Sequence, residues 1–63
     1  MIPVPVFTEN NDDNIIMYFD AEGKDIRSFS DELAGIYACY SKMSVKVKDG
    51  KQYVAVEVED SEN

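Results

Sequence analysis

The sequence predicts an α+β fold of ββ(β)αββ order, in which one helix packs on one face of an antiparallel sheet of four strands, or five. Three observations support this prediction. Residues 44–59 alternate between apolar and polar types around an Asp49-Gly50 turn. Residues 29–40 repeat apolar residues at helical spacing, and residues 14–20 form a short, strongly apolar run.

The first strand is expected over residues 2–8, where apolar residues alternate with Pro3 and Pro5. The two prolines are two residues apart, so both missing N–H groups point to the same lateral side of the strand. Prolines on one side are typical of an edge strand that recruits no further strand there. The polar run from Glu9 to Asp13 is the predicted turn.

The second strand is expected over residues 14–20. Apolar residues occupy both its odd and its even positions, which indicates a central strand covered on both faces. Residues 20–24 then predict a type I turn with Gly23 in the left-handed region, which would form a bulged hairpin. The optional fifth strand would follow through Lys24 to Arg27.

The helix is expected from about residue 30 to residue 42, with Ser30 as its N-cap and Ser28 as second choice. Its apolar stripe consists of Phe29, Leu33, Ile36, Tyr37 and Tyr40. The opposite side is small and uncharged, which lets another backbone approach closely. The residues predicted for self-association on this side are Ala34, Gly35, Ala38 and Cys39.

The last hairpin has the best-defined pairing. A two-residue turn at Asp49-Gly50 pairs Val47 with Gln52 and Val45 with Val54, and sets Lys46 opposite Tyr53. This pairing puts all the valines of the hairpin on one face, because side chains alternate along a strand. These valines are Val45, Val47, Val54, Val56 and Val58.

Composition restricts the kind of protein. The 63 residues predict one domain over residues 1–60, of marginal stability, followed by a loose acidic tail at 61–63. The single cysteine, Cys39, excludes a disulfide framework and predicts a reducing, cytoplasmic location. The chain has no His, so no zinc site is expected. We expect no catalytic residues, metal or cofactor, and take Cys39 to be a buried, inert thiol in mid-helix.

The charge distribution is the most unusual feature of the chain. The net charge is −7, and the nine acids in residues 1–23 and 52–63 have no Lys or Arg among them. All six bases lie in residues 24–51. Such a charge opposes binding to nucleic acid or to an anionic membrane, and it favours a basic protein partner.

The predicted partner-binding surface combines these acids with one aromatic anchor: Asp12, Asp13, Glu57, Glu59, Asp60 and Tyr53. The predicted function is that of a non-enzymatic inhibitor or modulator that binds a basic host protein and blocks its surface. The strongest form of this hypothesis is that an array of carboxylates imitates the phosphates of a nucleic acid. Small size and acidity are typical of phage- or plasmid-encoded accessory proteins. The array requires the turn near Asp12 and the last strand to meet in space.

The alternative is a self-assembling subunit, for example a homodimer, that associates through the small-residue helix face or through the second face of the sheet. On that second face, Tyr18 and Tyr53 are expected to form a half-exposed aromatic patch with Phe7, Ile16 and Lys46.

Overall fold

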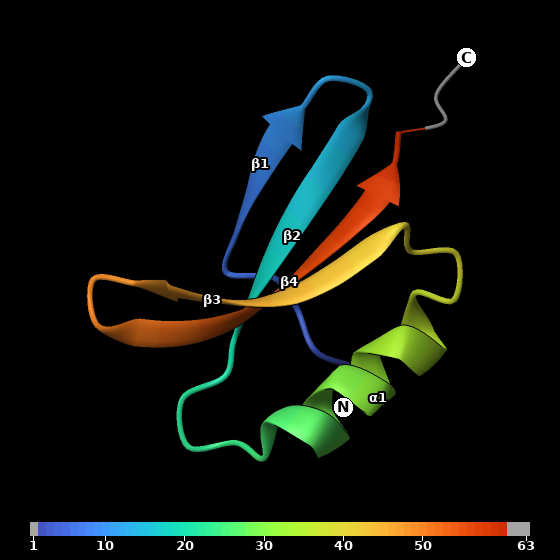
Figure 1. Cartoon of the computed structure of the whole chain (residues 1–63). Coiled ribbons are helices and arrows are strands. Elements are labelled where there is room, and N and C mark those ends of the chain that lie inside the picture. Colours follow the sequence, from blue (N-terminus) through green and yellow to red (C-terminus); the bar gives the residue numbers. More distant parts are fainter. Residues whose placement is uncertain (1, 61–63) are drawn as a thin grey trace.

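A computed structural model describes residues 2–60 of the chain. Its elements are β1 (Phe7–Asn11), β2 (Asn14–Asp20), α1 (Ile26–Ile36), β3 (Lys42–Lys48) and β4 (Lys51–Glu59). The four strands form one antiparallel sheet in the order β1-β2-β4-β3, with α1 on one of its faces (Figure 1). The predicted α+β fold and ββαββ order are therefore confirmed, whereas the optional fifth strand does not form within residues 2–60. The predicted loose tail, 61–63, lies outside the described residues.

The core lies between α1 and the two central strands. Pairing of β2 with β4 sets Met17 beside Val56 and Phe19 beside Val54, and these side chains point toward the helix. The helix contributes Phe29 and Leu33, which are buried against them. Each large apolar side chain buried in this way stabilises the fold by about 1.5–3 kcal/mol.

The β3–β4 hairpin has the predicted register, with Val45 opposite Val54, Lys46 opposite Tyr53 and Val47 opposite Gln52. Its turn residues Asp49 and Gly50 both have positive φ, 53° and 75°, as a two-residue type I′ turn requires. The valines share a face as expected, but the tip of the hairpin projects beyond α1 (Figure 1). Val45 and Val47 therefore remain 48% and 69% exposed.

The first strand is shorter than predicted and begins further along the chain. Residues 2–6 form no strand, and β1 instead includes Glu9–Asn11, which the sequence had placed in a turn. The Val6 N–H donates to the Tyr18 carbonyl at 2.8 Å, but the prolines before it have no N–H to continue the ladder. The turn itself contains only Asp12 and Asp13, and Asp12 adopts a φ of 58°, which Asp tolerates.

The segment after β2 leads into the helix instead of a third strand. Gly23 has the predicted left-handed conformation, with φ of 75°. However, the bulged hairpin and the strand from Lys24 to Arg27 were wrong predictions, because Asp25 caps a helix there. The Asp25 carboxylate accepts the Ser28 N–H at 3.2 Å, which satisfies one of the free donors of the first turn.

The helix therefore runs from Ile26 to Ile36, and not from about 30 to 42. Ser30 lies inside it and is not the N-cap. Beyond Ile36, the Tyr37 N–H still donates to the Leu33 carbonyl at 2.8 Å, but the chain then leaves the helix. Its route is set by β4, because the Ser41 N–H donates to the Glu57 carbonyl at 2.8 Å and Lys42 already belongs to β3.

The position of the cap can be tested by substitution. Asp25→Ala removes the capping acceptor and should lower the free energy of unfolding by about 1 kcal/mol. Ser30→Ala is the matched control and should cause no loss, because Ala is a better helix former in a helix interior. Urea denaturation of both variants measures this. A larger loss for Ser30→Ala than for Asp25→Ala would contradict the cap at Asp25.

Candidate functional site

The two acidic regions of the sequence meet at one end of the sheet. The Asp60 N–H donates to the Asp13 carbonyl at 2.8 Å, and Asn14 pairs with Glu59. The β1–β2 turn therefore lies directly beside the last residues of β4 (Figure 1). We call this region the acidic end, and its residues are Asp12, Asp13, Glu57, Glu59 and Asp60.

Tyr53, the predicted aromatic anchor, does not lie at the acidic end. It pairs with Asp20 on one side and Lys46 on the other. It lies four positions from Glu57 along β4, which corresponds to about 13 Å. Tyr53 shares the sheet face of Glu57, because residues of equal parity on a strand point to the same side. We call this face, which lies opposite α1, the open face.

Tyr53 belongs instead to an aromatic cluster on the open face. The Phe7 and Tyr18 rings stack with centroids 4.5 Å apart, and Tyr53 meets both rings edge-on at 5.5 and 6.3 Å. The Lys48 ammonium lies over the cluster, 5.0 Å from the centroid of Phe7 and 5.3 Å from that of Tyr18. Tyr18 is consequently buried, and not half-exposed as the sequence suggested.

An ion pair connects the end of β2 to the start of β4, at the opposite end of the sheet from the acidic end. The Lys51 ammonium lies 3.0 Å from an Asp20 carboxylate oxygen. The pKa of Asp20 is lowered, first by a hydrogen bond from the Glu22 backbone and then by Lys51, and the pKa of Lys51 is raised by Asp20. Both groups remain accessible to solvent, so this contact contributes little to stability.

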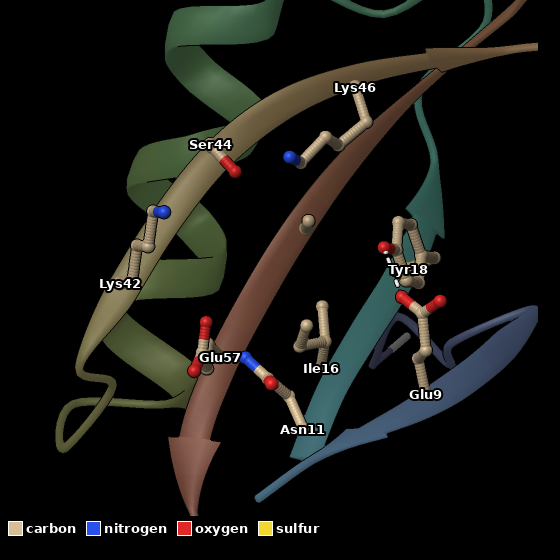
Figure 2. A pocket seen from close by; sticks show the side chains of 9 residues that line it. Glu9, Asn11, Ile16, Tyr18, Lys42, Ser44, Lys46 and Glu57 are labelled. Atoms are coloured by element: carbon tan, nitrogen blue, oxygen red, sulfur yellow. Dashed lines mark hydrogen bonds between the residues drawn. The ribbon is translucent and has the colours of Figure 1, made fainter. Parts of the chain in front are cut away.

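Glu9 is a member of the open face that sequence reasoning missed, because residues 9–13 were assigned to a turn. It pairs with Ile16 in the β1–β2 ladder. The Tyr18 hydroxyl donates to its carboxylate at 2.6 Å (Figure 2). On the other side of Ile16, Glu57 accepts the Asn14 side-chain N–H at 2.7 Å. Both carboxylates are therefore oriented by neutral donors.

A hollow of about 230 Å³ lies between these carboxylates and β3. Figure 2 shows side chains from all four strands around it, with two lysines on β3 and the acids on β1 and β4. Buried Ala55, with its small side chain, leaves the space at its centre. The residues that line it are Glu9, Asn11, Ile16, Tyr18, Lys42, Ser44, Lys46, Ala55 and Glu57.

The small-residue face of the helix is interrupted. Ala34 and Gly35 lie in α1, but Ala38 and Cys39 follow its end, so the four residues do not form one helical stripe. Gly35, Ala38 and Cys39 are exposed. The prediction that Cys39 is a buried thiol in mid-helix was wrong, because the helix ends three residues before it.

Within residues 2–60, no three acidic or cysteine side chains are grouped so that they could hold a metal ion. The same residues contain no helix that is long and apolar enough to cross a membrane. The fold and the site together define a small α+β protein in which five acids gather at one end of a sheet and whose open face bears charges of both signs. Comparison with protein-family models, curated proteins and solved structures finds no match to this chain.

The hydrogen bond between Tyr18 and Glu9 generates a pH prediction. This bond, followed by burial and the charges of Glu9 and Glu57, raises the pKa of Tyr18 above its usual 10.0. Because the pKa of Tyr18 is higher in the folded state than in the unfolded state, the protonated hydroxyl stabilises the fold. This contribution to the free energy of unfolding is complete below pH 10 and is lost as the pH rises through the folded-state pKa. In an ultraviolet titration, one tyrosine should ionise last, and Tyr18→Phe should remove that last step.

The matched variant Tyr37→Phe removes a tyrosine outside this contact and should leave the late step in place. A titration in which Tyr18→Phe leaves the late step unchanged would contradict the assignment.

Proposed function

We propose that this protein is a non-enzymatic binding protein whose acidic end engages a basic surface of a protein partner and blocks that surface by occlusion. The observation that supports the proposal is the hydrogen bond between Asp60 and Asp13, since it brings two acid-rich segments from opposite ends of the chain together. Five carboxylates on two adjacent structural elements provide a concentrated negative field.

The acidic end suits a partner that binds anions. Asp12 and Asp13 are exposed in a turn, and Glu59 and Asp60 are exposed at the end of β4. Accessible charges of one sign accelerate association with an oppositely charged surface, and salt screens them. A nucleic-acid-binding protein is therefore the class of partner we propose, with modulation of a host protein as the outcome.

We also propose a reducing, cytoplasmic location. Cys39 is exposed and forms no disulfide. An exposed single thiol persists more readily in a reducing compartment than in an oxidising one.

Capture from a host lysate tests the acidic end. The wild-type protein should retain a basic partner at low salt and lose most of it at moderate salt. The triple variant Asp12→Asn/Asp13→Asn/Asp60→Asn should reduce the association rate at least tenfold. The matched control Asp31→Asn/Glu32→Gln/Asp49→Asn removes three charges from α1 and the hairpin tip and should have a much smaller effect.

Equal losses in the two triple variants would show that net charge, and not the acidic end, drives binding. Failure to retain any basic partner at either salt concentration would contradict the proposal as a whole.

Self-association is a second candidate function, and the exposed end of α1 favours it. Gly35 and Ile36 are exposed there, and the small, exposed residues Ala38 and Cys39 follow after Tyr37, so another chain could approach the backbone closely. Small size also favours oligomerisation, because a short chain buries a limited core.

Light scattering over a range of concentrations tests this second candidate. The wild-type protein should form a dimer. Ala38→Arg should convert it to a monomer by placing a large charged side chain in the dimer interface. The same variant should leave partner capture by the acidic end unchanged. A wild-type protein that stays monomeric at the highest attainable concentration would contradict self-association.

A further inference from the structure

The hollow on the open face has two walls of opposite charge. One wall consists of Glu9 on β1 and Glu57 on β4, and we call it the carboxylate wall. The other consists of Lys42 and Lys46 on β3, and we call it the lysine wall. Ile16 lies between the two carboxylates, as Figure 2 shows, and together with Ala55 it forms an apolar floor.

Each carboxylate of this wall is held in position by an uncharged donor, and within residues 2–60 neither lies within 4.0 Å of an ammonium group, although Lys42 is the cross-strand neighbour of Glu57. Glu9 and Glu57 are both cross-strand neighbours of Ile16, so they flank it on the same face. Each accepts a hydrogen bond from an uncharged donor, the Tyr18 hydroxyl at 2.6 Å and the Asn14 amide at 2.7 Å. Neutral donors leave the negative charge of Glu9 available to a cation, and the charge of Glu57 acts both on its neighbour Lys42 and on a cation in the hollow.

The lysine wall is also available. Lys42 and Lys46 are four residues apart on β3 and therefore point to the same side, with the Ser44 hydroxyl between them. Within residues 2–60, an ion pair with a nitrogen–oxygen distance below 4.0 Å forms between Lys51 and Asp20, and neither lysine of this wall takes part in one. Two ammonium groups flanking a hydroxyl can bind a carboxylate.

The two walls together carry no net charge, and this determines the class of ligand. A simple cation is attracted to the carboxylate wall but repelled by the lysine wall, and the reverse holds for a simple anion. A molecule with both charges at opposite ends gains at both walls. The volume of about 230 Å³ holds roughly seven water molecules at about 30 Å³ each, which suits a ligand of fewer than ten or so non-hydrogen atoms.

We propose that this hollow is a binding site for a small zwitterion of the amino-acid type. The ammonium group of the ligand faces the carboxylate wall, its carboxylate faces the lysine wall, and its aliphatic chain lies on the apolar floor. The site goes beyond the proposed protein-binding function and shares only Glu57 with the acidic end. Solvent-accessible ion pairs are weak, so the expected dissociation constant is on the order of 1 mM or higher.

Amide chemical shifts in the isotope-labelled protein test the site with three probes of equal chain length. The probes are 6-aminohexanoate, hexylammonium and hexanoate. The zwitterion should shift the amides of Ser44, Ala55 and Glu57 and should bind several-fold more tightly than either singly charged probe. Equal binding of zwitterion and single charges, or the absence of shifts at these amides, would overturn the proposal.

Variants of each wall sharpen the test. Lys42→Gln/Lys46→Gln should remove the preference for the zwitterion and favour hexylammonium, whereas Glu9→Gln/Glu57→Gln should favour hexanoate. Lys24→Gln, a change of the same type beside Phe29 on the helix side, should leave the binding of all three probes unchanged. Unaltered selectivity in both wall variants, each with a folded-protein spectrum, would overturn the assignment of the walls.

The two proposals can fail separately. Lys42→Gln/Lys46→Gln should disrupt zwitterion binding while leaving capture of a basic partner intact, because it makes the surface more acidic. Asp12→Asn/Asp13→Asn/Asp60→Asn should weaken partner capture while leaving the hollow functional.

Discussion

The antiparallel pairing of β2 with β4 organises the whole sheet. It aligns Phe19 with Val54 and Met17 with Val56, and so creates the apolar surface on which Phe29 and Leu33 pack. The same register, continued to its far end, sets Asn14 opposite Glu59. A register shifted by two residues would keep each side chain on the same face of the sheet. It would nevertheless change the cross-strand partners in the core and separate the acid-rich segments. One pairing thus determines both the core and the acidic end.

The elements with strong local patterns could be predicted from the sequence. Alternation and the Asp49-Gly50 turn sufficed for the hairpin register, since both constrain the same strand pair. The helix start was misplaced because two serines competed with Asp25, and only the fold shows which residue caps it. Its end was misplaced because Tyr40 continues the helical spacing, whereas pairing of Ser41 and Lys42 with Glu57 draws the chain into β3. Tertiary hydrogen bonding overrode local periodicity there.

The candidate site was less predictable, because it depends on contacts between distant segments. The acids could be selected from the base-free ends, but their convergence required the β2–β4 register, which one sequence does not specify. Glu9 was missed together with the true extent of β1. The two signs of charge on the open face follow from the same topology. β3 occupies one edge and carries lysines, while its neighbour β4 and the other edge strand, β1, carry the acids. The protein is therefore acidic overall, with a locally balanced surface.

Cross-strand nuclear Overhauser effects report the register of β2 against β4 in solution. The β2–β4 register predicts contacts that link Ile15 with Val58 and Met17 with Val56, together with slow exchange of the Asp60 amide, whose acceptor is the Asp13 carbonyl. Contacts that instead link Met17 with Val58 would show a register displaced by two residues. That result would contradict both the arrangement of the core and the convergence of the acids at one end of the sheet.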